Sequence, residues 1–285
     1  MIRAWLLASR PKTLAAAVSP VMIGTALVLR DELPVDWRLA ACALLGAIFI
    51  QIGTNFVNDA LDFRKGADTS ERLGPLRVTQ AGLLSARSVL RGASICFVIA
   101  ALFGIPLVLR GGWPLLVIGV ASIVAAYAYT GGPWPLAYYG LGELFVLVFF
   151  GLVAVGGTYY VLTLSYTAAA ALCGIAAGSL AIVLLAINNL RDIENDRRAG
   201  KRTVAVRIGE GAARVEVAAA ALLPYAAVLA IGDPSLLLVT LSLPLAVFLI
   251  ARVGRSRGAA LNRSLALAGA LQWAFSLLFL AGAMI

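Results

Sequence analysis

The sequence predicts an all-α fold, a polytopic membrane bundle of nine transmembrane helices, and three observations support this prediction. The first is composition: of 285 residues, 61% are hydrophobic and only 13% are charged, against roughly 45–50% and about 25% in soluble domains. The second is that the apolar residues form continuous runs, whereas the strands of a membrane barrel would alternate. The third is an uneven distribution of basic residues between the loops.

Nine apolar runs approach the roughly 20 residues that a helix needs to cross the hydrocarbon layer of a bilayer. In chain order they are Leu14–Leu29, Leu39–Val57, Ala93–Leu109, Trp113–Tyr129, Leu141–Leu164, Ala168–Ile187, Val215–Ile231, Ser235–Ala251 and Leu265–Ile285. Polar or turn-forming residues bound each run, beginning with Lys12 before the first and Arg30 after it. No linker-like stretch divides the chain, so we expect a single domain over residues 1–285.

The basic residues indicate how the helices are oriented. Loops on one side of the predicted membrane hold 20 of the 23 Lys and Arg residues, and the other side holds Arg30, Arg38 and Arg110. Cytoplasmic loops carry an excess of Lys and Arg, so we expect the N-terminus in the cytoplasm and the C-terminus outside. This predicts a multi-pass protein of the cytoplasmic (inner) membrane, and the net charge of +9 is no evidence for nucleic acid binding.

Two short polar stretches follow the second and sixth runs and hold eight of the 14 acidic residues. Both stretches show helical spacing, so each set of side chains shares one helix face. The first set is Asn55, Asn58, Asp59 and Asp62, and the second is Asn188, Arg191, Asp192, Asn195 and Asp196. Asn58 and Asp62 recur 130 positions later as Asn188 and Asp192, which predicts two pseudo-repeats of four helices plus a ninth helix.

The residue types in these stretches favour a metal–phosphate site. Carboxylates one helical turn apart repel each other, and Mg²⁺ removes that repulsion while leaving coordination positions open for phosphate oxygens. Nearby Arg and Lys side chains supply donors that phosphates favour. The chain contains no histidine, which excludes His-based catalysis and His-ligated metals. A site at the end of a membrane bundle suits the diphosphate of a lipid-soluble molecule, which Mg²⁺ would stabilise as a leaving group.

Several motifs taken together resemble the UbiA superfamily of intramembrane aromatic prenyltransferases. They are Arg10-Pro-Lys-Thr-Leu14, Asn58-Asp59-Ala-Leu-Asp62, Gly74-Pro-Leu-Arg77, Tyr129-Thr-Gly-Gly-Pro133, Gly140-Leu-Gly-Glu143 and Asn188-Asn-Leu-Arg-Asp192. The family pattern Asn-x-x-x-Asp-x-x-x-Asp is complete in the second stretch, whereas in the first Gly66 stands at the last position and Asp68 follows. Pro133 stands where hydroxybenzoate-type members carry Lys, which favours the naphthoate branch (MenA type).

The resemblance implies Mg²⁺-dependent prenyl transfer from an allylic prenyl diphosphate to 1,4-dihydroxy-2-naphthoate, with loss of CO₂, in menaquinone biosynthesis. It implies as metal ligands Asn58, Asp62, Asp68, Asn188, Asp192 and Asp196. It implies as substrate-binding residues Asn55, Asn58, Arg64, Lys65, Arg72, Arg77, Tyr139, Asn188, Lys201 and Arg202. It implies as catalytic residues Asp59, Asp62, Asp192, Asp196, Tyr129 and Glu143, with Asp59 or Glu143 taking a phenolic proton.

Three alternatives stay open at this stage. One is a related transferase with another aromatic acceptor, a phytyl donor, or haem as acceptor of a farnesyl group. Another is a membrane carrier, which should place charges near the bilayer midplane, where this chain has almost none. The third is a phosphatidyltransferase, whose usual single acidic loop is not found here. Neither the prenyl chain length nor the oligomeric state follows from the sequence.

Overall fold

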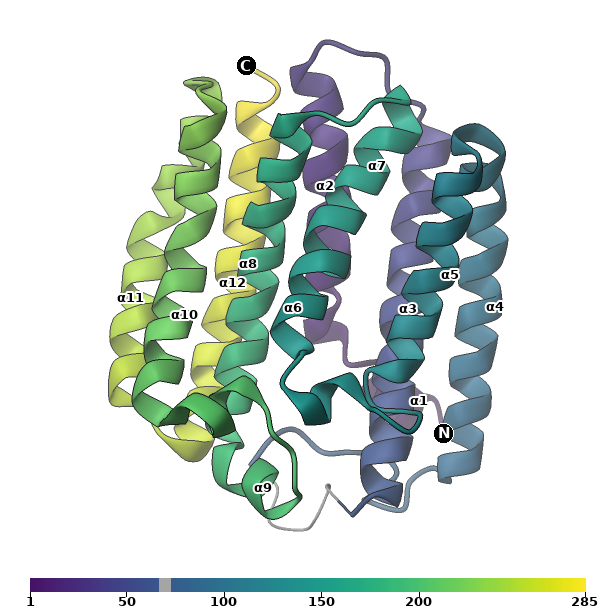
Figure 1. Ribbon diagram of the computed structural model, residues 1–285, viewed down its shortest axis with the longest axis vertical. Helices are drawn as coiled ribbons and strands as arrows, with labels where there is room; N and C mark the ends of the chain where they lie inside the picture. Colours follow the sequence, from purple (N-terminus) through teal and green to yellow (C-terminus); the bar gives the residue numbers. More distant parts are fainter. Residues whose placement is uncertain (67–72) are drawn as a thin grey trace.

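The computed structural model describes residues 1–66 and 73–285, and every regular element in these residues is a helix (Figure 1). The longer elements are α2 (Ala15–Arg30), α3 (Trp37–Arg64), α4 (Ala86–Gly111), α5 (Trp113–Ala128), α7 (Ala154–Thr163), α8 (Ala168–Arg191), α10 (Val204–Ile231), α11 (Leu243–Arg255) and α12 (Leu261–Gly282). The shorter ones are α1 (Ile2–Ser9), η1 (Pro11–Thr13), η2 (Leu136–Tyr139), α6 (Gly142–Val146), η3 (Leu147–Val153), α9 (Ile193–Arg198), η4 (Ser235–Ser242) and η5 (Gly258–Ala260). The termini lie at opposite ends of the bundle (Figure 1).

Each of the nine predicted runs coincides with a helix or a continuous set of helices, which confirms the all-α membrane fold. In the described residues, seven helices are long and apolar enough to cross a membrane, and an eighth span forms if α1–η1 and α2, bent by 49°, count as one. The helix α5 is apolar but shorter. The count of nine therefore stays a prediction, although termini at opposite ends agree with an odd number of crossings.

Two helix pairs reflect the predicted repeat. The most extensive interfaces join α3 to α4 and α8 to α10, which are the second and third spans of each predicted half. Both α3 and α8 run beyond the predicted apolar boundary, to Arg64 and Arg191. The extension of α3 carries Asn58 and Asp62. In the second stretch Asn188 lies on α8, but Asp192 follows its last residue and Asp196 lies on the short helix α9, so the expected single helix face is interrupted at Asp192.

Side-chain caps fix where several of these helices begin. Asp36 accepts hydrogen bonds from the backbone N–H groups of Arg38 and Leu39 at the start of α3, at 2.9 and 3.3 Å. Thr167 accepts one from Ala170 at the start of α8, at 3.1 Å. Such caps satisfy backbone donors that the first helical turn leaves free.

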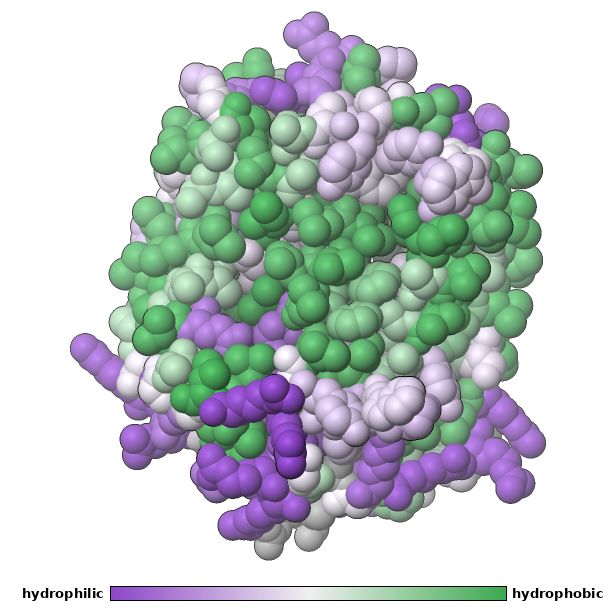
Figure 2. All heavy atoms as spheres, in the orientation of Figure 1, coloured by the Kyte–Doolittle hydropathy of each residue, from purple (hydrophilic) through white to green (hydrophobic). Residues whose placement is uncertain are grey.

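The outer surface matches a lipid environment. Figure 2 shows a wide hydrophobic belt around the middle, with hydrophilic side chains at the two ends and most of them at the lower end. Of the 18 residues that form the most apolar part of α4, only 17% are buried inside the protein. Its side chains Ile95, Val98 and Leu102 are 60%, 61% and 58% exposed. So much exposed apolar surface needs lipid to cover it, and the chain is a multi-pass membrane protein.

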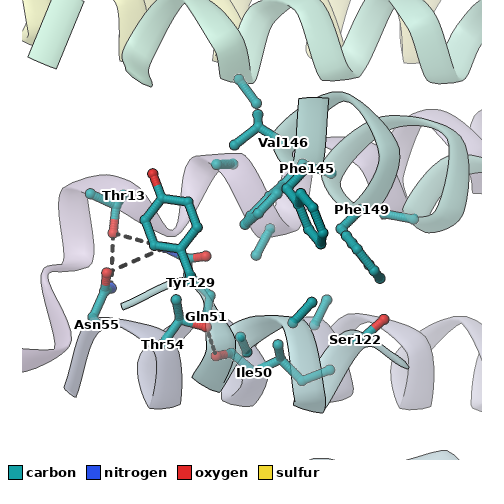
Figure 3. Close-up of a pocket in the computed structure, with 18 of the residues that line it drawn as sticks. Thr13, Ile50, Gln51, Thr54, Asn55, Ser122, Tyr129, Phe145, Val146 and Phe149 are labelled. Carbon is teal, nitrogen blue, oxygen red and sulfur yellow. Dashed lines mark hydrogen bonds between the residues drawn. The ribbon is translucent and has the colours of Figure 1, made fainter. Parts of the chain in front are cut away.

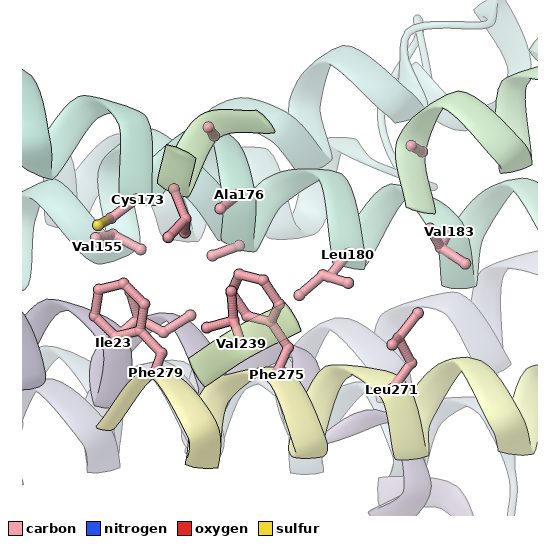
Figure 4. Close-up of a cluster of buried hydrophobic side chains, with 14 of the residues drawn as sticks. Ile23, Val155, Cys173, Ala176, Leu180, Val183, Val239, Leu271, Phe275 and Phe279 are labelled. Carbon is pink, nitrogen blue, oxygen red and sulfur yellow. The ribbon is translucent and has the colours of Figure 1, made fainter. Parts of the chain in front are cut away.

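The main core holds α8 between α2, α7 and α12 (Figure 4). Ile23 of α2, Cys173 of α8 and the aromatic side chains Phe275 and Phe279 of α12 are fully buried in it. Interiors of this kind are close-packed and resist displacement. The core therefore fixes the axis of α8, whose lower end carries the second polar stretch.

The fifth predicted run is a composite of α6, the π-helix η3 and α7. Gly151 of η3 lies directly against Gly174 and Gly178 of α8, and a Cβ at Gly151 would approach the Gly174 carbonyl oxygen to 2.3 Å. Glycines one turn apart allow two membrane helices to approach this closely. A π-turn redirects the side chains that follow it and is frequent at functional sites.

This close approach yields a stability prediction. Gly151→Ala should destabilise the protein by about 1–3 kcal/mol, because the added methyl group forces α8 and η3 apart. The matched control is Gly157→Ala, since a Cβ at Gly157 meets nothing within 4 Å. Thermal unfolding in detergent should show a clear fall in Tm for Gly151→Ala and none for the control. Equal Tm values for the two variants would contradict the packing described here.

Candidate active site

One large cavity, of about 1310 Å³, opens inside the helix ring. Its lower part is polar and its upper part is apolar. Ten of the sequence-predicted site residues line it: Asn55, Asn58, Asp62, Arg77, Tyr129, Glu143, Asn188, Asp192, Asp196 and Lys201. They come from both predicted halves of the chain. The two polar stretches therefore share one cavity, although 130 residues separate them.

Asp62 is the centre of the first cluster. It is only 6% exposed, yet three donors surround its carboxylate. Oδ1 accepts from the Tyr138 hydroxyl at 3.1 Å and from Lys201 Nζ at 3.3 Å, and Oδ2 accepts from an Arg77 guanidinium nitrogen at 3.3 Å. A buried carboxylate is stable only with such partners. Asp62 is thus held ionised inside the cavity.

Lys201 joins the two clusters. Besides Asp62, its ammonium nitrogen lies 3.9 Å from Asp196 Oδ1. One cation thus contacts a carboxylate from each polar stretch. Because the ammonium is compact, the tips of the two stretches must face each other across a few ångströms, as the sequence-based interpretation requires.

Lys65 does not line the cavity, but its side chain lies beside the same cluster. Its ammonium donates to the Thr130 carbonyl oxygen at 2.5 Å and lies 4.7 Å from the centre of the Tyr138 ring, which Lys201 faces at 4.8 Å. Burial lowers the pKa of Lys65, the Asp62 carboxylate opposes this, and nearby Lys201 lowers the pKa further. Two cations thus lie beside one aromatic ring, where the ring electrons attract positive charge.

The second cluster is held by an arginine. The guanidinium of Arg191 is fully buried and contacts both oxygens of Asp192. It also donates to Asn188 Oδ1 at 2.7 Å. In the first cluster, the Thr130 hydroxyl donates to Asn58 Oδ1. Each asparagine therefore has its amide oxygen fixed by a neighbouring donor.

Asp59 occupies a different environment from its neighbours. It is 1% exposed, does not line the cavity, and accepts backbone N–H groups from Val78 at 3.1 Å and from Thr79 at 2.9 Å. Both carboxylate oxygens hold the loop that precedes α4. This geometry favours a structural role for Asp59 over the catalytic role expected from the sequence.

The other residues that the sequence analysis assigned to the site lie in different places. The exposed side chains of Arg64, Tyr139 and Arg202 do not line the cavity, so their expected contacts with substrate are not formed in this structure. Asp68 and Arg72 lie outside the described residues. By contrast, Glu143 lines the cavity, where Asn189 donates to its Oε1 at 2.9 Å.

Asn55, expected as a substrate-binding residue, faces the cavity at the level of Tyr129 together with Gln51, which the sequence analysis missed (Figure 3). Asn55 donates to the Ser9 carbonyl oxygen and to the Thr13 hydroxyl, at 2.9 and 3.0 Å. The Gln51 amide nitrogen lies 3.4 Å from both Thr13 Oγ1 and Asn55 Oδ1. Gln51 Oε1 is buried and has no hydrogen-bond partner among the described residues. Gln51 stands one helical turn before Asn55, so the helical spacing of the first polar stretch is the sequence signal that could have identified it.

Above these polar groups the cavity becomes apolar. Phe145 and Phe149 are stacked with ring centres 5.6 Å apart, and Phe149 reaches the wall from the π-helix η3 (Figure 3). Gly104 and Gly119 also line this part, and a Cβ at either would meet nothing within 4 Å. This part of the cavity can accommodate a long hydrocarbon chain beside aromatic faces.

The donor set fits a magnesium ion held together with a phosphate ligand. Asp62, Asp192 and Asp196 offer carboxylate oxygens, and Asn58 and Asn188 offer amide oxygens, which are the hard ligands that Mg²⁺ prefers. Within residues 1–66 and 73–285, no three acidic or cysteine side chains converge to hold a metal by themselves. This is the usual situation for Mg²⁺, which proteins bind through one or two carboxylates plus substrate phosphates.

Comparisons with known proteins identify the family that the chain resembles. A model of the UbiA prenyltransferase family matches residues 17–279. The chain is 40% identical to a 1,4-dihydroxy-2-naphthoate octaprenyltransferase of Haemophilus influenzae, over 86% of this chain and 83% of that protein. It is 41% identical to the protein of the same name from Escherichia coli, over 74% of this chain and 70% of the other.

Solved structures show the same fold at low sequence identity. An apo UbiA homologue from Aeropyrum pernix K1 superposes with a TM-score of 0.70 at 17% identity, covering 93% of this chain and 96% of that one. A UbiA homologue from Archaeoglobus fulgidus, bound to DMAPP and Mg²⁺, superposes with a TM-score of 0.67 at 14% identity, covering 99% of each chain.

Proposed function

The chain belongs to the UbiA prenyltransferase family, and from this premise we propose that it transfers a prenyl group from an allylic polyprenyl diphosphate to 1,4-dihydroxy-2-naphthoate. The reaction gives demethylmenaquinol, the hydroquinone form of demethylmenaquinone, together with diphosphate and CO₂. It serves menaquinone biosynthesis, and oxidation of the quinol to the quinone is a separate step. Relatives named for this activity are 33–41% identical to the chain. One observation carries the proposal: Lys201 contacts Asp62 and Asp196 together, so two acidic clusters and one cation line the same part of a single cavity.

The diphosphate end of the donor binds between the two clusters. Asn58, Asp62, Asn188, Asp192 and Asp196 would hold Mg²⁺, which when bound supplies Lewis-acid stabilisation of the leaving diphosphate. Lys201 and Arg77 reach the same space and donate to phosphate oxygens. Lys65 adds positive charge behind Tyr138. These groups stabilise negative charge as it develops on the leaving oxygen.

The prenyl tail extends into the apolar upper part of the cavity. There Phe149 and the neighbouring aliphatic side chains exclude water, which would otherwise capture an allylic cation. The faces of Tyr129 and Phe145 stabilise positive charge through their ring electrons. The tail thus binds where burial of apolar surface is favourable, and only the diphosphate lies at the polar end.

The acceptor ring supplies electrons to the allylic carbon. One C–O bond of the donor breaks and its electron pair leaves with the diphosphate, while a ring electron pair forms the new C–C bond. The pair from the C–CO₂ bond remains on the ring as CO₂ departs, so no net proton is released and no oxidant is needed. Glu143, held by Asn189, lines the cavity and is placed to move a phenolic proton.

The polar group around Gln51 supports the position of this ring. Gln51 Oε1 can accept a ring hydroxyl, since it is buried and lacks a partner in the described residues. Arg10 and Lys12 line the same part of the cavity and offer positive charge for the ring carboxylate. Arg10 is held there in a left-handed backbone conformation, with φ 51°.

The site lies at the cytoplasmic face of the cell membrane. The short helix α9 lies at the lower end of the bundle (Figure 1), and Figure 2 shows most of the hydrophilic side chains at that end. Asp196 and Lys201, in and shortly after α9, line the cavity. An excess of Lys and Arg marks the cytoplasmic side. Both substrates carry negative charge and approach from water, which suits this orientation.

The proposal is tested by incubating membranes that contain the protein with carboxyl-labelled dihydroxynaphthoate, several polyprenyl diphosphates and Mg²⁺. We expect a prenylated naphthohydroquinone, recovered as the quinone after oxidation by air during extraction, and equimolar labelled CO₂. Membranes without the protein are the control, and 4-hydroxybenzoate replaces the acceptor in a parallel reaction. Product from hydroxybenzoate alone, or from neither acceptor, would contradict the proposed reaction.

A further inference from the structure

Arg191 makes more side-chain hydrogen bonds than a simple ion pair requires. It ends α8 and its side chain is fully buried. The guanidinium contacts both oxygens of Asp192, donates to Asn188 Oδ1 at 2.7 Å and donates to Asn262 Oδ1 at 2.9 Å. One side chain therefore fixes two of the proposed metal ligands and reaches a third residue on another helix.

Asn262 continues this connection toward the first cluster. It lies at the start of α12 and belongs to neither polar stretch. Its Nδ2 donates to the Leu73 carbonyl oxygen at 2.8 Å, four residues before Arg77, which contacts Asp62. The oxygen accepts and the nitrogen donates, so only one amide orientation satisfies both contacts.

The contacts to Arg191 leave room for a metal ion. A carboxylate offers about four lone-pair positions and an amide oxygen offers two. Arg191 uses one on each oxygen that it contacts, so Asp192 and Asn188 retain lone pairs for coordination. The planar guanidinium holds the carboxylate in a defined plane, and groups that orient ligands in this way typically change metal affinity by about 10–100-fold when removed.

We propose that Arg191 and Asn262 form a positioning pair that orients Asn188 and Asp192 for the divalent cation and links the second cluster to the loop that carries Arg77. The inference rests on the proposed function, because it assigns the pair to the same metal–diphosphate site. Arg191 is a positioning residue, since it acts through Asp192. Asn262 acts one step further away, by holding Arg191.

The experiment measures Mn²⁺ affinity of the purified protein in detergent, by electron paramagnetic resonance, with and without geranyl thiodiphosphate. Arg191→Lys keeps the charge but loses the fork of donors, and should weaken Mn²⁺ binding by about 10–100-fold. Asn262→Leu should weaken it by about tenfold, the low end of that range. The double variant should bind no more weakly than Arg191→Lys alone, because the two residues act in series.

Arg197→Lys is the matched control. Arg197 also pairs with an acid, Glu194 at 2.8 Å, but it is exposed on α9. Its replacement should leave Mn²⁺ affinity unchanged. Thermal unfolding of every variant separates positioning from structure: unchanged Mn²⁺ affinity in Arg191→Lys, with or without a lower Tm, would overturn the inference.

The result also separates this inference from the proposed function. If the unsubstituted protein prenylates dihydroxynaphthoate but Arg191→Lys binds Mn²⁺ normally, only the positioning role fails. If the variants show the expected losses of Mn²⁺ affinity but the unsubstituted protein prenylates no naphthoate, the positioning role stands and the assigned acceptor fails.

Discussion

Asp192→Ala is expected to lower kcat by at least about 10²–10³-fold, the usual loss when one group that stabilises charge on a reacting oxygen is removed. Asp192 lines the cavity in the second cluster, where Arg191 holds its carboxylate. Without it the leaving diphosphate loses a proposed metal ligand, while the apolar tail can still bind. We therefore expect the fall in kcat to exceed any change in KM for the prenyl diphosphate.

Metal removal should reproduce this loss. EDTA should abolish prenyl transfer by the unsubstituted protein, and added Mg²⁺ should restore it. Glu194→Ala provides the matched control, because Glu194 is a nearby acid that pairs with Arg197 and is exposed. Steady-state kinetics with labelled prenyl diphosphate would measure all three. Full activity of Asp192→Ala, or activity that persists in EDTA, would contradict the two-cluster mechanism.

Asp59→Ala is expected to have the largest effect on stability among the acidic residues. Its buried carboxylate accepts the backbone N–H groups of Val78 and Thr79. Removing it leaves two buried donors unsatisfied, and each such group costs about 1–3 kcal/mol. A total loss of about 2–6 kcal/mol follows, a large fraction of the stability of about 5–15 kcal/mol that is usual for a folded protein.

Asp62, three residues later, provides the comparison that tests this prediction. Thermal unfolding in detergent should show a much lower Tm for Asp59→Ala than for Asp62→Ala. Activity per folded molecule should fall far more for Asp62→Ala. Asp59→Asn should be intermediate in Tm, because one acceptor oxygen remains. A normal Tm for Asp59→Ala together with lost activity would support the catalytic role that the sequence suggested.

Most of the polar residues that line the cavity could be predicted from the sequence, because the relevant signals were local. Helical spacing put Asn58 and Asp62 on one face of one helix, and the repeat identified Asn188 and Asp192 as their equivalents. The same spacing also included Asp59, which packs against the loop before α4 instead. Local spacing could not separate the two, since the position of that loop is a tertiary property.

Gln51 and Asn262 could hardly be identified as residues of the site from sequence patterns. Gln51 extends the first stripe by one turn, but a single amide in an apolar run also suits a helix–helix contact. Asn262 is a lone polar residue beside the last span, and nothing near it in the sequence connects it with Asp192. Its contacts with Arg191 and Leu73 join segments separated by 71 and 189 residues.

By itself the sequence determined that this chain folds as a membrane-embedded helical bundle, because continuous apolar runs and one-sided basic loops have no other stable arrangement. It also determined the chemistry of the polar ends, since residue type fixes which ligands an oxygen or a guanidinium can bind. Only the tertiary structure decided which side chains meet. Lys201 reaches both Asp62 and Asp196 because the core around α8 and the α3–α4 interface hold the two helix ends at one depth. That distance depends on the packing of the whole bundle and on no local pattern.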